Sequence, residues 1–456
     1  MNKLSDMYRH HFKAMTQWFE QKQHKPLVMR GARQVGKSTL VRLFAEQQQL
    51  ELVELNFERN PELADIFVSN DPKQILATLR LMQNKAIKPG QAMLFLDEIQ
   101  AAPQILASLR YFYEDMPDMH VVAAGSLLDF ELASPSFSMP VGRISYLHLH
   151  PMSFSEFLRA VGEQALAEFI EAWQMGDDMP VPVHQKLMGL LRQCMAVGGM
   201  PEAVKSFAEF HDYRQAEQIK QDLLATFADD FAKYARHQDH ELIRQTFRKA
   251  PTLVGRKVKY SEINKDMPTL RVAQTLNQLE MARVVNKVLR TAANGLPLSA
   301  EENVKFFKLL FLDVGLVSTM MNVSWQALQE DLLLINQGAL AEQWVGQELL
   351  SSLDGHIPPH LHYWGREARS SSAEVDFVIA NDKPVPIEVK AGKSGTLKSL
   401  HLFLKEKPAD LAVRLNADIP SIMLDDHELP DGSRKSYSLI SLPLYMAGQV
   451  RRILSI

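Results

Sequence analysis

The sequence predicts a multidomain α/β protein, and three of its features lead to that fold class. At 456 residues the chain is longer than the roughly 250–300 residues at which a single hydrophobic core stops growing. In the N-terminal third, near-continuous apolar strands alternate with helices, which predicts a parallel sheet covered on both faces. After a long helical stretch, an α/β pattern resumes from about Asp331.

The elements of the N-terminal third follow one another closely. A first helix is expected within residues 1–20, before any strand. Four strands and three further helices then alternate, with strands expected at 27–29, 50–56, 92–96 and 120–124 and helices at 37–47, 71–82 and 103–113. This order is that of a doubly covered parallel sheet.

Composition limits the classes of function. A net charge of −4 excludes a globally basic nucleic-acid coat, although it leaves room for a local basic patch. The single cysteine, Cys194, excludes a disulfide framework and fits a reducing compartment. The first 21 residues lack the apolar core of a signal peptide, and no apolar run reaches the length of a membrane span. We therefore expect a cytoplasmic protein without a membrane partner.

A glycine-rich turn follows the first strand and matches the P-loop pattern. Its glycines let the backbone fold around phosphates, and amides at the following helix N-terminus point at the anion. Lys37 would neutralise the β- and γ-phosphates of ATP, and the Ser38 hydroxyl would bind Mg²⁺. The alternative is a plain glycine-rich turn between packed elements. The predicted nucleotide-binding residues are Gly31, Ala32, Arg33, Gln34, Val35, Gly36, Lys37, Ser38 and Thr39.

Two further apolar strands end in polar side chains. The strand at 92–96 leads into Asp97, which fits a magnesium carboxylate, and Glu98, which would polarise the attacking water. The alternative is a solvated acidic turn. Ser126 ends the next strand and would contact the γ-phosphate or the water, unless it is only a helix cap. Arg143 is a candidate charge-stabilising finger, with a surface salt bridge as the equal alternative.

Several of these segments together resemble a known family. The runs GARQVGKST, MLFLDEIQ, VVAAGSLLDF and VGRISYLHLHPMSFSEFL are similar to the AAA-type ATPases of a large bacterial and archaeal family, most members of which are described only as ATP-binding proteins with a C-terminal domain of unknown function. The resemblance extends through VGGMPEAV and FKLLFLDVGL to nearly the whole chain. It implies an AAA+ core with the Walker A motif at Gly31–Ser38, the Walker B motif at Asp97–Glu98 and a sensor at Ser126. It implies little about biological role.

The middle of the chain predicts a winged helix. Helical periodicity continues from 154 to 236, as in a helical lid, and three short helices and a hairpin around Asn294-Gly295 follow. Arg271, Gln274 and Asn277 share one face of the third helix and could reach phosphates or base edges. DNA contact and protein contact both fit this arrangement. Basic side chains cluster just before that helix at Arg244, Arg248, Lys249, Arg256, Lys257 and Lys259.

The last part of the chain carries the D…ExK pattern of restriction-endonuclease-like folds. Asp376 lies on one predicted strand, and Glu388 and Lys390 share one face of the next. Glu342, on the preceding helix, matches an extra acid that often accompanies the pattern. The pattern nominally has a proline immediately before the first acid, where this chain has Val375. Two carboxylates can hold Mg²⁺ or Mn²⁺, and a lysine can position water near a phosphate. The alternative is a domain of this fold that has no catalytic activity and uses the acids only for binding. His360 and His362 alternate on a strand, and without cysteine partners we interpret them as structural.

These patterns predict four regions: a P-loop ATPase core at 1–153, a helical lid at 154–236, a winged helix at 237–325 and a nuclease-like domain at 326–456. The expected function is Mg²⁺-dependent ATP hydrolysis coupled to DNA handling. The alternative is an ATP-dependent switch whose C-terminal fold binds a protein partner without catalysis. AAA-type ATPases commonly assemble, so we also expect a homo-oligomer.

Overall fold

The computed structural model describes residues 8–84, 86–126, 128, 140–231, 240–330, 338–368, 371–390, 397–428 and 434–455. These residues form two units, which are described separately. Unit 1 contains residues 1–150, 281–283 and 353–359, and unit 2 contains residues 151–280, 284–352 and 360–456. The first boundary, after residue 150, lies close to the predicted end of the ATPase core at 153, whereas the three regions predicted after it fall almost wholly within unit 2.

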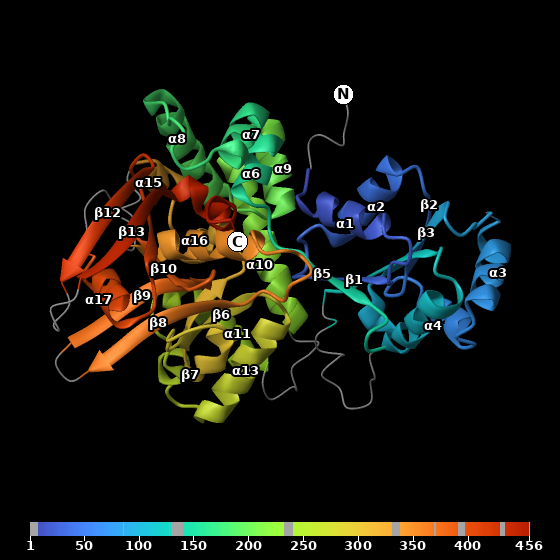
Figure 1. The fold of residues 1–456 in the computed structure, drawn as a ribbon. Coiled ribbons are helices and arrows are strands. Elements are labelled where there is room, and N and C mark those ends of the chain that lie inside the picture. Colours follow the sequence, from blue (N-terminus) through green and yellow to red (C-terminus); the bar gives the residue numbers. More distant parts are fainter. Residues whose placement is uncertain are drawn as a thin grey trace. The chain divides into compact units, whose positions relative to one another are not determined.

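Unit 1 is built on a five-stranded parallel sheet with the strand order β2-β3-β4-β1-β5 (Figure 1). Helical segments separate β1 from β2, β2 from β3 and β3 from β4, as parallel connections require. Because the strands are parallel, their carboxyl ends meet at one edge of the sheet. The strands are β1 (Leu27–Arg30), β2 (Glu51–Asn56), β3 (Ala92–Asp97), β4 (His120–Ala124) and β5 (Ser145–His148).

Both faces of this sheet are buried, which explains the near-continuous apolar strands. Leu94 and Leu96 of β3 pack with the helices α3 and α4, whereas Phe95, between them, points to the other face and is equally buried. The predicted strands and helices of this region are confirmed within a few residues. The helical segments are α1 (His11–Phe19), α2 (Lys37–Gln47), η2 (Pro61–Phe67), α3 (Pro72–Gln83), η3 (Ile99–Ala101), η4 (Pro103–Ala107) and α4 (Ser108–Asp115).

Unit 2 begins with a helical region, as the sequence predicted. Its helices α8, α9, α10 and α14 pack against one another. In the described part of this region they are α6 (Phe154–Ala160), α7 (Gln164–Ala172), α8 (Val181–Val197), α9 (Pro201–Phe210), α10 (Tyr213–Asp230), α14 (Val314–Met320) and α15 (Trp325–Glu330).

A buried aspartate joins two segments of this helical region. Asp313 accepts a hydrogen bond from Leu316 N at 3.0 Å and so caps α14. Its second oxygen accepts from Gly199 N at 2.6 Å. Any Cβ on Gly198 would come within 2.2 Å of Asp313 Oδ1, so only glycine fits at this approach. The segments VGGMPEAV and FKLLFLDVGL, far apart in sequence, therefore meet around one carboxylate.

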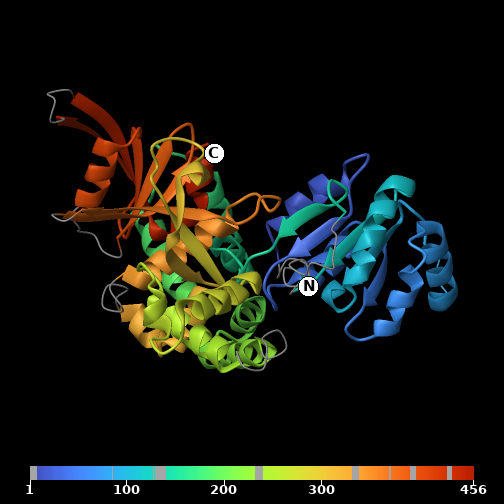
Figure 2. The same cartoon turned by 90° about the horizontal axis from the view of Figure 1, so that it is seen from below.

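The rest of unit 2 surrounds an eight-stranded mixed sheet with the order β12-β13-β11-β10-β9-β8-β6-β7. Figure 2 shows the yellow-green helices that follow residue 240 beside the orange and red strands of this sheet. The strands β11, β12 and β13 had not been predicted. The strands are β6 (Val285–Thr291), β7 (Glu302–Phe311), β8 (Leu361–Ala368), β9 (Ser371–Ala380), β10 (Pro384–Val389), β11 (Leu411–Asn416), β12 (Ser421–Glu428) and β13 (Arg434–Pro443).

The hairpin of the predicted winged helix belongs to this same sheet. Three helices precede β6 and β7, as expected, and isolated bridges join Val254 and Lys257 to β7. However, β6 also pairs in parallel with β8, and this pairing satisfies the outer edge of the hairpin. The hairpin is thus shared by both predicted regions. The helical segments here are α11 (His240–Lys249), η7 (Ala250–Leu253), α12 (Tyr260–Ile263), α13 (Thr269–Met281) and η8 (Leu298–Glu301).

Helices cover both faces of the eight-stranded sheet. Leu400 and Phe403 of α17 pack with Val375 of β9 on one face. Asp376, the next residue of β9, points to the other face, where α16 contacts β7 and β10. The remaining helical segments are α16 (Ala339–Ser351), α17 (Lys398–Glu406), η10 (Leu444–Gln449) and α18 (Val450–Ile453).

Candidate functional sites

The P-loop of unit 1 connects β1 to α2 and has the conformation that its glycines permit. Gly36 has a φ of 93° and precedes the first residue of α2, Lys37. At Gly31, a Cβ would lie 2.4 Å from the carbonyl oxygen of Leu149, so the backbone approaches closely only without a side chain. The loop therefore presents backbone amides at a helix N-terminus, which is a site for an anion.

Lys37 is the buried cation of this loop. Its Nζ donates to the carbonyl oxygens of Gly31 at 3.0 Å and Ala32 at 2.8 Å, and the residue is 8% exposed. In the part of the chain that the structure describes, it makes no ion pair with a carboxylate. Burial lowers the pKa of Lys37 to about 8, although the nearby charges of Glu98 and Asp97 act in the opposite direction. An anion beside Lys37 would therefore stabilise its charged form.

The predicted magnesium residues lie together at the carboxyl edge of the sheet. Ser38 Oγ donates to Asp97 Oδ1 at 2.9 Å, and Asn56 Nδ2 donates to Asp97 Oδ2 at 3.3 Å. Burial raises the pKa of Asp97, while the hydrogen bond from Ser38 opposes this change. Asn56 was not predicted. Asn56 lies opposite Asp97 in the β2–β3 register. The predicted strand 50–56 ends at Asn56, and this strand end was the available signal for its place beside Asp97.

Glu98 follows Asp97 in the left-handed region, with a φ of 51°. Its Oε2 accepts a hydrogen bond from Gln100 Nε2 at 2.6 Å. A Cβ at Gly125 would lie 2.5 Å from Gln100 Oε1, so a glycine at the end of β4 leaves room for this amide. Gln100 was also missed by the sequence analysis, and it orients the carboxylate that we predicted to polarise water.

Ser126 and Arg33 bring β4 and the P-loop together. Arg33 Nε donates to Ser126 Oγ at 3.1 Å, and Ser126 is 5% exposed. This contact places Ser126 beside the P-loop, and its role as a sensor stays a prediction.

Arg143 lies on the surface of unit 1 in a salt bridge. Its Nε donates to Glu114 Oε1 at 2.7 Å, and its side chain is 42% exposed. The hydrogen bond with Glu114 raises the pKa of Arg143. The surface salt bridge that the sequence left as an alternative is therefore present, and a role in catalysis stays a prediction.

The unit 1 residues fit ATP and Mg²⁺. The loop offers backbone amides and a buried ammonium that donates to two backbone carbonyls, which suits a phosphate chain. The pair Ser38–Asp97 supplies oxygen ligands of the kind that Mg²⁺ prefers.

In unit 2, the predicted D…ExK residues converge on one face of the sheet. The antiparallel register pairs Ile387 with Phe377, and continuing it by one position brings Glu388 opposite Asp376. Lys390 Nζ donates to Glu388 Oε1, and Asp376 Oδ2 accepts from Val389 N at 2.8 Å. The expected arrangement of Asp376, Glu388 and Lys390 is thus present.

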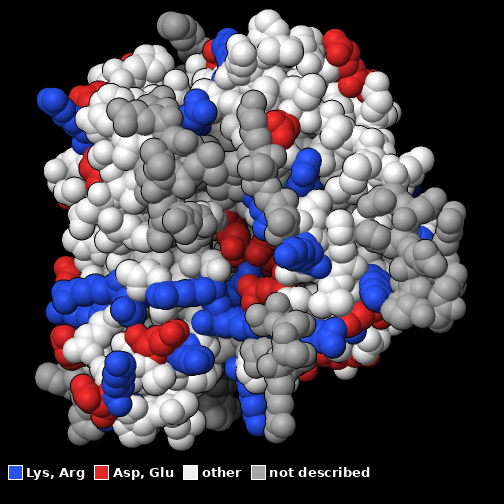
Figure 3. All heavy atoms as spheres, turned by 90° about the vertical axis from the view of Figure 1, so that its left-hand side faces the viewer, with Lys and Arg blue, Asp and Glu red and all other residues white. Residues whose placement is uncertain are grey.

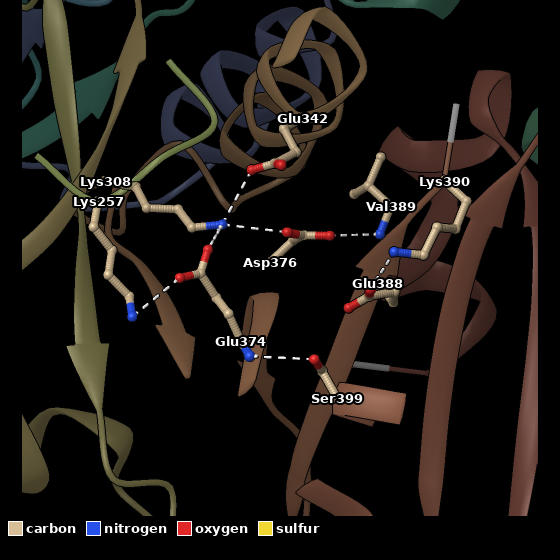
Figure 4. A network of polar contacts seen from close by, with 9 residues as sticks. All are labelled: Lys257, Lys308, Glu342, Glu374, Asp376, Glu388, Val389, Lys390 and Ser399. Atoms are coloured by element: carbon tan, nitrogen blue, oxygen red, sulfur yellow. Dashed lines mark hydrogen bonds and ion pairs between the residues drawn. The ribbon is translucent and has the colours of Figure 1, made fainter. Parts of the chain in front are cut away.

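A lysine that was not predicted occupies the centre of these acids (Figure 4). Lys308 comes from β7 and is 2% exposed. Its Nζ lies 2.6 Å from Glu374 Oε1, 3.1 Å from Glu342 Oε2 and 3.2 Å from Asp376 Oδ1. We call Lys308, Glu342, Glu374, Asp376 and Glu388 the acid cluster.

Two carboxyl groups of the acid cluster, those of Glu342 and Glu388, have raised pKa values. Burial raises the pKa of Glu342 to about 8, and the neighbouring charge of Asp376 adds to the effect. Burial and Asp376 likewise raise the pKa of Glu388 to about 7. By contrast, burial alone would lower the pKa of Lys308, but the charges of Glu342, Asp376 and Glu374 raise it well above its ordinary value. Lys308 is therefore a firmly charged ammonium.

The predicted recognition helix and its basic neighbours are only partly exposed. Gln274 and Asn277 of α13 are exposed, whereas Arg271 is half-buried. Arg244 pairs with Asp229 at 3.3 Å, and Lys257 pairs with Glu374 at 3.4 Å. Three basic side chains of the group remain exposed, namely Arg248, Arg256 and Lys259.

The surface of unit 2 carries charges of both signs. On the face that lies to the left in Figure 1, acidic side chains gather in a hollow, and a band of Lys and Arg side chains lies beside it (Figure 3). Such a band can attract a polyanion, whereas the acids in the hollow repel it unless a cation intervenes.

Comparison with known families decides the class of unit 1. Residues 23–158 match the family model described as "AAA domain". The prediction of an AAA-type P-loop ATPase domain is thereby confirmed. Residues 188–327 match "Domain of unknown function (DUF8612)", and residues 337–444 match "Domain of unknown function (DUF4143)". The winged-helix and nuclease-like identities stay predictions.

Solved structures show distant similarity. The Aeropyrum pernix ORC1 protein in complex with DNA has 14% identity and a TM-score of 0.31, with 72% of this chain and 96% of that chain covered. The Thermotoga maritima RuvB Holliday junction branch migration motor has 14% identity and a TM-score of 0.27, with 64% and 88% covered. AMPPCP-bound DnaA from Aquifex aeolicus has 10% identity and a TM-score of 0.23, with 59% and 85% covered. At these scores, nothing about function follows.

Two findings are negative. No curated protein matches the sequence. Among the described residues, none forms a helix that is both long and apolar enough to cross a membrane.

Proposed function

We propose that the chain binds ATP with Mg²⁺ at the P-loop of unit 1 and hydrolyses it there. The observation that carries this proposal is Lys37, a buried ammonium whose hydrogen bonds go to two backbone carbonyls. A buried charge without a counterion is costly, so a site that retains one is suited to an anionic ligand.

Each residue of the site has a distinct role in this proposal. Lys37 neutralises the β- and γ-phosphates, and Ser38 and Asp97 hold Mg²⁺, which offsets the charge that develops during phosphoryl transfer. Glu98, oriented by Gln100, accepts a proton from the attacking water. Ser126, which accepts a hydrogen bond from Arg33 of the P-loop, senses the terminal phosphate in this proposal.

Calorimetry and turnover on the full chain test the proposal. Lys37→Ala should lose tight MgATP binding, whereas Glu98→Gln should bind MgATP as the wild type does and lose turnover. Gln100→Ala should reduce turnover less than Glu98→Gln, because it loosens the carboxylate without removing it. Wild-type affinity in Lys37→Ala would show that the nucleotide binds elsewhere.

We propose further that the nucleotide state of unit 1 controls nucleic-acid handling by unit 2. The exposed Arg248, Arg256 and Lys259, together with the basic band of unit 2, support contact with a phosphate backbone. The double variant Arg256→Ala, Lys259→Ala should weaken binding of a DNA duplex and lower the salt slope by about 1 to 2. The matched control is Lys186→Ala, which removes an exposed lysine from α8.

A second candidate function concerns cleavage at the acid cluster. The convergence of Asp376, Glu388 and Lys390 favours a metal-dependent nuclease. Lys308 opposes it, because its ammonium already lies within 3.2 Å of Glu342 and Asp376, the oxygens that a divalent ion would need. With Lys308 in this position, the cluster does not fit Mg²⁺ or Mn²⁺. We therefore propose that unit 2 binds without cutting.

Cleavage assays separate these two outcomes. Plasmid and oligonucleotide substrates are incubated with Mg²⁺ or Mn²⁺ and the wild type, Glu388→Ala or Lys308→Met. Our proposal expects no metal-dependent cleavage by the wild type. Cleavage that the wild type shows and Glu388→Ala lacks would instead establish the nuclease, with Lys308 displaced during the reaction. A protein partner in place of DNA would appear as an absence of salt-dependent DNA binding in every variant.

A further inference from the structure

A second group of ligand-type side chains lies on the opposite face of the eight-stranded sheet from Lys308. Tyr363 of β8 contacts Lys308, whose Nζ lies 5.6 Å from the centre of the tyrosine ring. His362, the preceding residue, lies opposite Val378 in the β8–β9 register, and Val378 packs with the α17 side chains on the other face of the sheet. His360, two positions earlier, lies beside His362, with 4.7 Å between the ring centres.

Both histidines point at one carboxylate. His360 Nε2 lies 2.8 Å from Glu302 Oε1, and His362 Nε2 lies 2.6 Å from the same oxygen. One ligand atom from each of the three residues lies within 4.8 Å of the others. Two imidazole nitrogens and a carboxylate oxygen thus converge from two strands, β7 and β8, that are not adjacent in the sheet.

We propose that Glu302, His360 and His362 form a metal site for Zn²⁺ or a divalent transition ion of similar preference. Imidazole and carboxylate together suit such ions, and three protein ligands leave a fourth position of a tetrahedron for water. Ligand distances of about 2.0–2.2 Å from Zn²⁺ require the nitrogens to move only slightly away from Glu302. Each histidine binds through Nε2 as a neutral imidazole, so a proton on Nε2 that faces the carboxylate must first move to Nδ1; only an imidazolium releases a proton to solvent on binding.

The exposure of the three side chains suits entry of an ion from solvent. The His362 side chain is 11% exposed and that of Glu302 is 17% exposed, whereas the His360 side chain is 44% exposed. Two ligands are thus held by their surroundings, and the third lies open at the surface. The open side provides both the path for the ion and the place for the water ligand.

The site would fasten the β6–β7 hairpin to the rest of the sheet. Glu302 is the first residue of β7, and His362 lies in β8, with β6 between these strands. The two residues are 60 positions apart in sequence. A bound ion therefore closes a long loop and joins the region that precedes residue 325 to the C-terminal region.

Metal binding to the full-length chain, stripped of metal beforehand, tests the proposal. Calorimetry with Zn²⁺ alone should give one site per chain that is lost in His362→Ala and in Glu302→Ala. Zn²⁺ at a hundredfold excess over its dissociation constant should raise the melting temperature of unit 2 by about 5 °C. Co²⁺ in place of Zn²⁺ should give the visible absorption of a four-coordinate ion with nitrogen ligands, which reports on the ligands directly.

Matched variants keep this test decisive. His211→Asn removes an exposed histidine of unit 2 and should leave metal binding unchanged. Asp376→Asn should also leave it unchanged, because the acid cluster lies on the other face of the sheet. His362→Gln, a milder change, serves if His362→Ala fails to fold. Zn²⁺ binding that persists in both His362 variants, or a wild type that takes up no Zn²⁺ or Co²⁺, overturns the proposal. Neither result bears on ATP binding.

Discussion

Two buried lysines of this protein have opposite surroundings. Lys37 in unit 1 donates to two carbonyls, and burial lowers its pKa to about 8. Lys308 in unit 2 lies among three carboxylates, which raise its pKa well above the ordinary value. The same side chain is thus proposed to bind a ligand in unit 1 and belongs to an internal ion cluster in unit 2. What distinguishes them is that carboxylates contact the Lys308 ammonium directly, whereas Glu98 and Asp97 act on Lys37 from a distance.

The comparison also explains the different fit of the two sites for their expected ligands. Ser38 and Asp97 contact one another without an intervening cation, so the entry of Mg²⁺ displaces only a hydrogen bond. Glu342 and Asp376 each contact the Lys308 ammonium, so the entry of a divalent ion must displace a charge. The second exchange is far more costly in a buried site, where like charges repel strongly.

The largest expected effect is on stability, from Lys308→Ala. This change leaves three partly buried carboxylates without their cation, and we expect unit 2 to lose about 3–5 kcal/mol. Lys37→Ala removes a charge that pairs with no carboxylate among the described residues, and it should leave the stability of the nucleotide-free protein nearly unchanged. Urea unfolding followed by fluorescence measures both. Equal losses in the two variants would contradict the distinction drawn between these lysines.

The second effect is on nucleotide affinity. Here the Lys37 variant should have the larger effect and the Lys308 variant the smaller one, the opposite of the order expected for stability. Lys37→Ala should raise the dissociation constant of MgATP by about 100-fold, or about 2.7 kcal/mol, because a charge-assisted contact to phosphate is lost. Lys308→Met, whose side chain has a similar length, should bind MgATP as the wild type does. Calorimetry at fixed Mg²⁺ concentration gives both values. A large loss of affinity in Lys308→Met would show that unit 2 influences the nucleotide site.

The P-loop site of Lys37 could be predicted from the sequence, whereas the contacts of Lys308 with the acids of unit 2 could not. Gly31 to Ser38 are contiguous, and Asp97 ends an apolar strand, so pattern alone located them. Lys308 is 68 positions from Asp376 and lies on a strand that was assigned to another region. The available signal was a single lysine within the apolar run Phe306–Leu310, together with Glu374 at the same-face position two residues before Asp376.

The strand pairing in the sheet of unit 2 could likewise not be predicted from the sequence. The pairing of β6 with β8 joins residues about seventy positions apart, and no turn links them directly. The strands β11 to β13 were not predicted, because they lie C-terminal to the D…ExK pattern and carry no motif of their own. His360 and His362 were interpreted as structural because only cysteine partners were considered, while Glu302, which completes the set, belonged to a predicted hairpin.

A smaller effect concerns pH. Below pH 8 the nucleotide-free protein holds Lys37 charged, and above it the lysine loses its proton because burial disfavours the charged form. Bound phosphates raise that pKa, so above pH 8 ATP binding takes up a proton. The dissociation constant of MgATP should therefore rise by up to about tenfold per pH unit above pH 8. Calorimetry in two buffers of different ionisation enthalpy measures the proton directly. Lys37→Ala should show no uptake, and an identical uptake in that variant would assign the proton to another group.

The smallest effect on stability is expected at Arg143, and it separates the two interpretations of that residue. The Arg143–Glu114 pair is exposed, so Arg143→Ala and Glu114→Ala should both leave the melting temperature unchanged. If Arg143 acts only in this pair, the two variants also share wild-type ATPase activity. If Arg143 contacts the nucleotide of a neighbouring subunit, Arg143→Ala loses activity and Glu114→Ala keeps it.

Mixing variants then tests whether Arg143 acts across a subunit interface. Lys37→Ala chains lack the nucleotide site but retain Arg143, and Arg143→Ala chains have the opposite defect. A mixture of the two should regain part of the activity, because some interfaces combine an intact P-loop with an intact arginine. The gain should increase with protein concentration as mixed assemblies form. An active monomer whose specific activity is independent of concentration would assign Arg143 to the surface salt bridge, because no neighbouring subunit would then be needed.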